Sequence, residues 1–423
     1  MIIILLLFLI LETYLLSRVL KYFLLSPIYL YIIFSFLCIV LSVLYYYFFD
    51  NKFSLFELDN VSNTSFLAII KMYIIALIFF IMGVIIYYDQ SSKKTKKLFN
   101  RSFTDKLFLN YEVSNTIIYF AIAIFLIISF LFLITYGEGI FIREDYIPNR
   151  NKGLTTIIKI LSFIESLILG LIYKKNKFVS ITLFTLFILI TLGTGSRTVF
   201  LFFLLYNLLI FISNGNTLLN KVRFSIQIFL SLFLLAYIMQ LRSLPEHGIV
   251  PYLKSIGSSS QDFSRSFFFN IYYSFIYGVF VTIKTVKEAA LDWNIIWVNI
   301  NPLFGKMAGW YDYADKMRIN RYIPYSLHGR VFKTGLIFTI FYFFITGLIF
   351  SYFEKKIRNL LNNRNRIFAF VLVIILVLHI VYAFEYNMRS AIRYFYYAFF
   401  LILIAYLFRE IIKNLPNKRI NES

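Results

Sequence analysis

The residues of this sequence that could carry chemistry are arginines and histidines beside long apolar runs. Arg197 ends the glycine-rich break TGSR, and Arg242 directly follows a later apolar run. Arginine offers a planar fork of N–H donors that fits phosphate and pyrophosphate groups. His328 and His247 lie in the polar stretch 242–330, and a histidine near neutral pH can take a proton from a hydroxyl group. These residue types predict an anionic, phosphate-containing ligand and a proton transfer at a histidine.

The same stretch also carries aromatic residues and further arginines. All three tryptophans of the chain fall there, and aromatic faces offer apolar platforms that suit sugar rings. We therefore expect a sugar linked through pyrophosphate to a membrane lipid, with further contacts from Arg265, Arg330, Trp310, Arg389 and Arg393. The last two are four residues apart and share one face of a helix. A purely structural interpretation stays open, in which Trp and Tyr form the interfacial belt and Arg contacts lipid phosphates.

Other kinds of site are not indicated. The sequence has no GxxxxGK(S/T) phosphate loop and no cluster with metal-ligand spacing, so we expect neither ATP hydrolysis nor a metal ion or other cofactor. Glu12, Glu165 and His379 lie inside apolar runs, where an ionisable residue is a functional hypothesis by default. A proton relay is one interpretation. Because the three are scattered along the chain, we interpret each as satisfied by a hydrogen bond between helices.

The elements that must position these residues are membrane-spanning helices. The chain has 423 residues, of which 60% are hydrophobic and 15% charged, whereas a soluble domain is about one half apolar and one quarter charged. Uncharged runs of about 20 residues match the thickness of a bilayer core, and helices satisfy their own backbone there. A soluble enzyme is excluded, and the single cysteine, Cys38, excludes an intrachain disulfide. The fold class is therefore all-α, a polytopic bundle of about 11 spans with a large extracytoplasmic loop, the spans lying near 2–17, 28–49, 66–88, 116–136, 155–173, 178–193, 198–213, 224–241, 331–352, 367–386 and 391–409.

The distribution of the net charge of +21 along the chain indicates how this bundle is oriented in the membrane. Basic residues far outnumber acidic ones in alternate connections, such as 93–106, 174–177 and 355–366, which predicts that these connections are cytoplasmic. The N-terminus is then outside and the C-terminus cytoplasmic, and no nucleic-acid partner is implied. The first run lacks a basic n-region and a cleavage site, so we expect a retained span.

The count of about 11 spans depends on how two stretches of the sequence are interpreted. The run 178–213 must cross twice, interrupted at 193–197, and the aromatic run 267–283 must be re-entrant or membrane-lying. Three parts result: an N-terminal bundle of eight spans (1–241), a large extracytoplasmic loop (242–330) and a C-terminal part with three spans and a tail (331–423).

Two segments resemble a known family. LGTGSRTVFLFFLLYNLLIF, which contains Arg197, resembles the helix with an "SR" motif in bacterial O-antigen and capsule repeat-unit polymerases of the Wzy type and in the related O-antigen ligases. YSLHGRVFKTGLIFTIFYFFITGLIF resembles the end of the large periplasmic loop of that superfamily, with His328 and Gly335 matching its His and glycine. The general layout from about 180 to 350 is similar, including one large outer loop before the last three spans. Gly329-Arg330 departs from the small polar residue that commonly follows the His in ligases, which favours the polymerase.

The resemblance implies a metal-independent, inverting glycosyltransferase of a GT-C-like fold in the bacterial inner membrane. It would join undecaprenyl-pyrophosphate-linked repeat units into O-antigen or capsular polysaccharide at the outer face of that membrane. Arg197 and Arg242 would bind the donor pyrophosphate and stabilise its charge as it leaves, and His328 or His247 would deprotonate the acceptor hydroxyl. Its partners would be the lipid-linked donor and acceptor, membrane lipid and, as a further candidate, a chain-length regulator protein. The ligase, a lipid-linked oligosaccharide flippase and a non-catalytic membrane partner stay open as alternatives.

Overall fold

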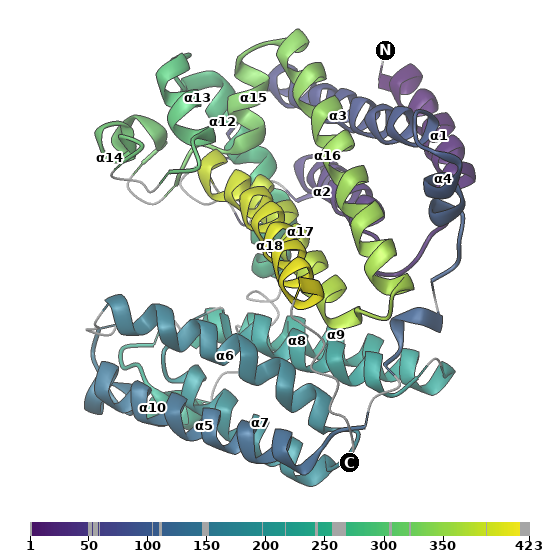
Figure 1. The fold of residues 1–423 in the computed structure, drawn as a ribbon. Helices are drawn as coiled ribbons and strands as arrows, with labels where there is room; N and C mark the ends of the chain where they lie inside the picture. Colours follow the sequence, from purple (N-terminus) through teal and green to yellow (C-terminus); the bar gives the residue numbers. More distant parts are fainter. Residues whose placement is uncertain are drawn as a thin grey trace. The chain divides into compact units, whose positions relative to one another are not determined.

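The computed structural model describes most of the chain and is helical throughout the described part. It describes residues 2–49, 53, 58, 60–103, 105–109, 112–145, 152–196, 198–215, 217–241, 244–255, 268–303, 307–320, 323–385 and 387–414. Within these ranges the only β-pairing consists of isolated bridges. The chain forms two compact units (Figure 1): unit 1 comprises Met1–Phe103 and Tyr272–Ser423, and unit 2 comprises Thr104–Ile271. The compact units therefore divide the expected loop 242–330 between them.

Unit 1 is built from long helices and a layer of short ones. The long helices are α1 (Ile2–Val19), α2 (Pro27–Phe48), α3 (Asn63–Asp89), α16 (Leu336–Asn362), α17 (Arg366–Glu385) and α18 (Met388–Asn414). The short ones are α4 (Lys93–Phe99), α12 (Tyr277–Glu288) with a π-helical turn before it (Tyr272–Ile276), α13 (Trp293–Ile300), α14 (Trp310–Tyr313) and α15 (Leu327–Lys333). The backbones of α3 and α16 approach each other closely at Gly83 and Gly347. A Cβ atom on Gly83 would collide with the carbonyl oxygen of Phe344, and a Cβ atom on Gly347 with that of Phe80.

Unit 2 is a second helical bundle. It contains α5 (Asn115–Tyr136), α6 (Lys152–Ile172), α7 (Lys177–Leu192), α8 (Thr198–Ser213), α9 (Leu218–Gln240) and α10 (Ile249–Lys254). Its core includes Phe184 stacked on Tyr206 at 3.7 Å between ring centroids, with the Tyr206 hydroxyl 3.0 Å from Ser180 Oγ. The expected interruption of 178–213 is confirmed, since α7 and α8 are separate helices.

Eight helices of the described chain are long and apolar enough to cross a membrane, as a multi-pass membrane protein requires. They are Pro27–Phe48, Asn63–Asp89, Asn115–Ile140, Gly153–Ile172, Leu218–Leu235, Leu336–Asn362, Arg366–Phe384 and Met388–Leu407. The other three expected spans are also helices: α1 with 18 residues, and α7 and α8 with 16 each. The expected span 331–352 is wrong at its start, because residues 331–333 belong to α15. Gly335, with φ +105°, breaks the helix before α16 begins.

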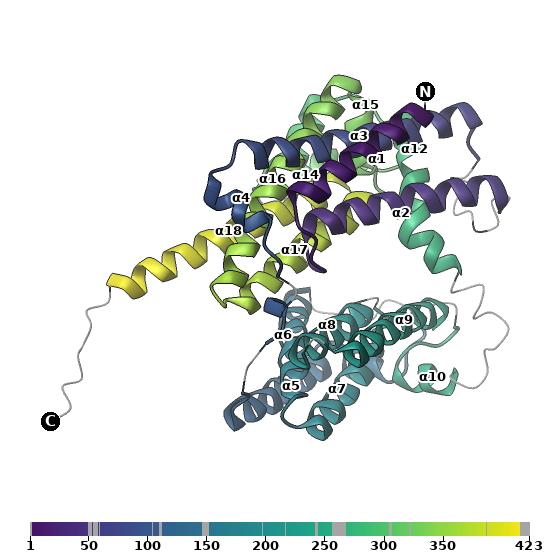
Figure 2. The ribbon, with the colours of Figure 1, turned by 90° about the vertical axis from the view of Figure 1, so that its right-hand side faces the viewer.

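The aromatic run that precedes residue 288 lies across the end of α2. Figure 2 shows α12 crossing α2 rather than running alongside it. The Phe280 ring is 5.8 Å from that of Tyr45, near the end of α2, and 5.9 Å from that of Phe66, near the start of α3. The same ends of α2 and α3 are joined by the first expected outer connection. This arrangement favours the membrane-lying interpretation over a twelfth span.

Three basic connections meet at one end of unit 1. The Arg358 guanidinium donates hydrogen bonds to the carbonyls of Lys21 (2.7 Å), Phe99 (2.9 Å) and Arg101 (3.3 Å). Its Nε lies 2.7 Å from the Glu354 carboxylate, and both side chains are fully buried. Connections that the charge pattern assigns to one side are therefore in direct contact.

Candidate functional site

Three of the expected site residues, Arg197, Arg242 and Arg265, lie outside the described residues. The segments that flank the first two do meet in unit 2. Val199, two residues after Arg197, and Leu241, directly before Arg242, pack in one buried apolar cluster with Leu192 and Tyr252. The fold of unit 2 therefore brings together the chain on either side of the two arginines that the sequence singles out.

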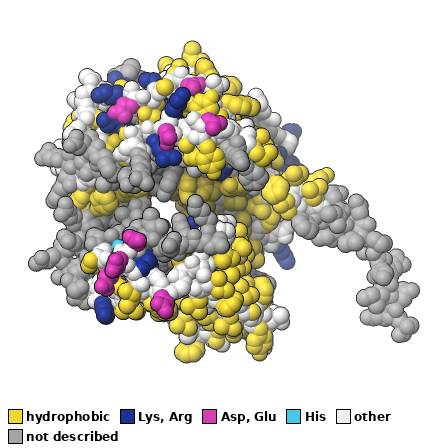
Figure 3. All heavy atoms as spheres, turned by 90° about the vertical axis from the view of Figure 1, so that its left-hand side faces the viewer, with side chains coloured by type: hydrophobic (Ala, Val, Ile, Leu, Met, Phe, Trp, Pro, Cys, Tyr) yellow, Lys and Arg dark blue, Asp and Glu magenta, His cyan; other side chains and the backbone are white. Residues whose placement is uncertain are grey.

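His247 belongs to the same end of unit 2 and is only 4% exposed. Its backbone pairs with that of Arg143 in an antiparallel bridge, with N···O distances of 2.7 and 2.8 Å, and its Nδ1 lies 3.1 Å from the Tyr252 hydroxyl. Burial, assisted by the positive charge of Arg143, lowers the pKa of His247, while a backbone hydrogen bond at Leu241 and the charge of Asp145 oppose this shift. The ring is therefore neutral at pH 7. On the face that Figure 3 presents, a histidine lies among acidic and basic side chains.

Arg143 is a residue that sequence reasoning missed. Its guanidinium donates to the carbonyls of Gly139 (2.8 Å) and Gly193 (2.7 Å), which ties the loop after α5 to the end of α7. The signal for it in the sequence was an arginine within an acid-rich outer connection, against the positive-inside bias. Arg143 thus fixes the end of α7, directly before the TGSR segment that leads into α8.

His328, the expected base, lies in unit 1 as part of the aromatic core and is 1% exposed. Its Nδ1 is 2.8 Å from the carbonyl oxygen of Ala383, so the ring donates Nδ1–H there. The rings of Phe384 (4.3 Å), Tyr73 (5.1 Å) and Phe343 (5.5 Å) surround it. Burial lowers the pKa of His328 to about 3. In this conformation His328 is a neutral packing residue of unit 1, whereas the segments of Arg197 and Arg242 belong to unit 2.

Arg330, expected to bind substrate, instead bonds to the backbone. It donates to the carbonyls of Ala290 and Lys316, both at 2.9 Å, and stacks 4.7 Å above the centre of the Tyr325 ring. Burial lowers the pKa of Arg330. In this structure its donors therefore tie the chain just after α12 to the segment at Lys316.

Arg389 is used in the same way. It is 3% exposed, and it donates to the carbonyl of Val298 in α13 and to those of Asn301 and Leu303 in the loop after α13. This side chain therefore secures that loop to the start of α18. Trp310 is likewise a packing residue, because it lies against the buried cluster of Ile295, Val298 and Met317.

The expected hydrogen bonds of the ionisable residues inside helices are found at one position and not at the other two. His379 Nδ1 on α17 is 2.8 Å from the Ala391 carbonyl on α18, which confirms the bond between helices. Glu12 Oε2 and both carboxylate oxygens of Glu165 are buried without a partner among the described residues, so the structure shows no such bond at these atoms within that part of the chain.

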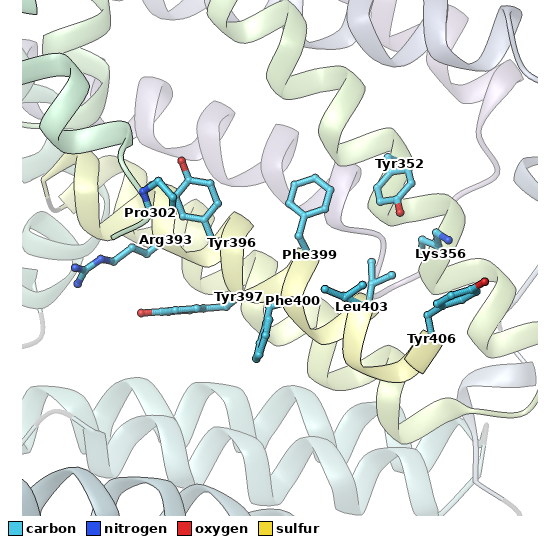
Figure 4. Close-up of a pocket in the computed structure, with 11 residues that line it drawn as sticks. Pro302, Tyr352, Lys356, Arg393, Tyr396, Tyr397, Phe399, Phe400, Leu403 and Tyr406 are labelled. Carbon is cyan, nitrogen blue, oxygen red and sulfur yellow. The ribbon is translucent and has the colours of Figure 1, made fainter. Parts of the chain in front are cut away.

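Arg393 is the expected site residue that lines a cavity. The cavity is a groove of about 850 Å³ along α18 (Figure 4). It is lined by Pro302, Tyr352, Lys356, Arg393, Tyr396, Tyr397, Phe399, Phe400, Ile402, Leu403 and Tyr406. No hydrogen bond or ion pair joins Arg393 to another residue of the described chain. From Arg393 to Tyr406 the helix rises about 20 Å, so the groove follows much of a candidate span.

The lining of the groove defines what it can hold. Aromatic and aliphatic side chains form its length, with Arg393 towards the start of α18 and Lys356 towards the end of α16. Lys356 lies 5.3 Å from the centre of the Tyr352 ring, so its charge is partly matched within the groove. Arg393 offers donors that no residue in the described part of the chain uses. An elongated apolar molecule with an anionic head fits this distribution.

No protein-family model matches the chain, and neither a curated protein nor a solved structure does. Groups of three or more His, Cys, Asp or Glu side chains that could hold a metal ion are also absent from the described ranges.

Proposed function

We propose that this protein is a membrane glycosyltransferase of the Wzy type, which joins undecaprenyl-pyrophosphate-linked repeat units into O-antigen or capsular polysaccharide. The observation that carries the proposal is the groove along α18. Its apolar length suits a polyprenyl chain, and Arg393 offers charge-assisted donors to a pyrophosphate. On the charge pattern, the start of α18 faces the outside of the bacterial inner membrane.

In this proposal each of the two lipid-linked substrates contacts a different set of charged residues. The groove with Arg393 holds one lipid-linked glycan by its carrier. Arg197 and Arg242 hold the donor pyrophosphate and stabilise the negative charge that develops on it as the glycosidic bond to phosphate breaks. The acceptor hydroxyl then attacks the anomeric carbon with inversion, and its proton passes to a histidine. His247 shares unit 2 with the segments of Arg197 and Arg242, so we assign the proton acceptor to His247 ahead of His328.

The test is transfer by the purified full-length protein in liposomes, with a synthetic undecaprenyl-pyrophosphate repeat unit as donor and acceptor. We expect a ladder of polymer lengths without added metal. Arg393→Ala should raise KM for the lipid-linked substrate at least ten-fold, and Arg393→Lys should restore part of it, as an anionic ligand requires. The matched control is Lys97→Ala, which removes an exposed cation on α4. An unchanged KM in Arg393→Ala would refute binding of the lipid-linked substrate in the groove.

Deletion of the gene separates the alternatives in cells. Single-repeat glycans on the surface lipid support the polymerase. Accumulated lipid-linked polymer would indicate the ligase, and repeat units trapped at the inner leaflet would indicate the flippase. Normal polymer in the deletion strain would contradict the polymerase, the ligase and the flippase, so that the non-catalytic membrane partner would be the remaining candidate.

A further inference from the structure

One carboxylate in the interior of unit 2 has no counter-charge among the residues that the structure describes. Glu165 lies on α6 and is 0% exposed, as is Ser166, and Ser162 is 1% exposed. Ser166 Oγ donates to the Ser162 carbonyl at 2.8 Å. Both carboxylate oxygens of Glu165 and the Ser162 hydroxyl have no hydrogen-bond partner in the part of the chain that the structure describes. Residues three apart share a helix face, so these oxygens are on one side of α6.

The neighbouring helices supply no cation for Glu165. Helices α5, α7 and α8 pack on α6. Neither α5 nor α8 contains Lys, Arg or His, and the only cationic side chain of α7 is Lys177, its first residue. On α6 itself, Lys152 is the first residue and Lys159 is exposed.

The other titratable groups of these helices are tyrosines. They are Tyr119 and Tyr136 on α5 and Tyr206 on α8, whose hydroxyl lies 3.0 Å from Ser180 Oγ. An ionised carboxylate buried among such neighbours would bear an uncompensated desolvation cost.

We propose that Glu165 and Ser162 form a binding site for a monovalent cation, either a proton or Na⁺. Carboxylate and hydroxyl oxygens are hard ligands that suit both ions and do not favour soft metals. A single positive charge neutralises the single carboxylate, whereas a divalent ion would leave a net charge buried in the bundle. The proposal is independent of the glycosyl-transfer proposal, because it concerns charge balance within unit 2.

The test uses dicyclohexylcarbodiimide, an apolar reagent that modifies protonated carboxyl groups, on the full-length protein in detergent. Modification of Glu165 is measured by mass spectrometry of its peptide from pH 5.5 to 8.5 in Na⁺-free choline buffer, and again with added NaCl. We expect modification in choline buffer that decreases as pH rises. Protection of ten-fold or more by NaCl, but not by choline chloride, identifies Na⁺ as the ligand, and no protection identifies the proton. Absence of modification at every pH, while the SDS-unfolded protein reacts at Glu165, would overturn the proposal.

A second variant keeps the test independent of reagent access. Glu165→Gln preserves the shape of the side chain and needs no cation. We expect it to fold, to lose the modification and to have a Tm that no longer depends on NaCl or on pH through this site. If Glu165 were instead paired with a basic residue, Glu165→Gln would lower the Tm strongly, and the cation site would be refuted.

Discussion

The buried pair of Glu354 and Arg358 allows the most direct test of how unit 1 is held together. Arg358→Met removes the guanidinium while keeping an unbranched apolar side chain of similar length. Glu354 is then left fully buried without its counter-charge, with the Ser26 hydroxyl donating to it at 2.9 Å and the Ile28 backbone N–H as a further donor. The carbonyls of Lys21 and Arg101 lose the donor from Arg358 at the same time, whereas the Phe99 carbonyl keeps the backbone N–H of Lys21 at 3.0 Å.

The expected loss follows from these contacts. Removing one partner of a buried ion pair costs about 3–5 kcal/mol, because the other charge stays buried and unpaired. Each orphaned carbonyl adds a cost of about 1–3 kcal/mol, although the terms overlap because one side chain serves all of them. We therefore expect the free energy of unfolding of unit 1 to fall by about 4 kcal/mol. At about 2 °C per kcal/mol for a unit of about 250 residues, the Tm should fall by roughly 8 °C.

The assay is thermal unfolding of purified protein in detergent, followed by tryptophan fluorescence, since the tryptophans belong to unit 1. Lys355→Met is the matched control, because Lys355 is the half-buried neighbour of the pair and should change stability by less than about 0.5 kcal/mol. Replacing both members, Arg358→Met with Glu354→Leu, should recover part of the loss, because no charge is then buried alone. A Tm of Arg358→Met within about 2 °C of the parent would refute the reasoning.

Further predictions concern the two buried histidines and the close packing of helices. Burial lowers the pKa of His328 to about 3, so between pH 6.5 and 3 only the unfolded chain binds this proton, and acidification should destabilise the fold by up to about 1.4 kcal/mol per pH unit. The side-chain amide introduced by His328→Asn can still donate to the Ala383 carbonyl, so this variant should fold, with a Tm at pH 7 lowered by the ring packing that it loses, and show a weaker acid dependence; equal acid dependence in parent and variant would contradict the assignment. If His328 is a base rather than a packing residue, the same variant will fold and fail to transfer sugar. His247, whose pKa is also lowered, should contribute stability above pH 6.5 that decreases on acidification, and His247→Asn should reduce this pH dependence in a thermal melt of the full chain. Gly347→Ala should cost about 1–3 kcal/mol by forcing α3 and α16 apart, whereas Gly139→Ala, which meets no atom within 4 Å, should leave the Tm nearly unchanged.

The helices of this protein were largely predictable because hydropathy and charge are local properties of the chain. The expected run 198–213 coincides with α8, and the break at 193–197 separates α7 from α8 as the glycines suggested. The hydrogen bond between helices at His379 was also predicted correctly. The start of the span at 331 was not, since the break at Gly335 depends on a backbone conformation that composition does not reveal.

The roles of the charged residues depended on partners far away in the sequence. Sequence reasoning grouped Arg330, Arg389 and Arg393 as equivalent outer arginines. Only the tertiary structure separates them, because the donors of the first two are used by backbone carbonyls from distant segments, while Arg393 lines a groove.

The sequence by itself determined that the chain is a helical membrane protein. Apolar runs long enough to cross a bilayer, and the bias of charged residues between the connections, are both local properties of the sequence. The tertiary structure decided which polar groups are satisfied. Arg143 and Arg358 bind carbonyls that lie 50 residues or more away, and the carboxylate oxygens of Glu165 have no partner within the described ranges. The free energy of a buried charge depends on the partners that surround it in three dimensions, and those partners follow from the packing of helices rather than from the order of residues.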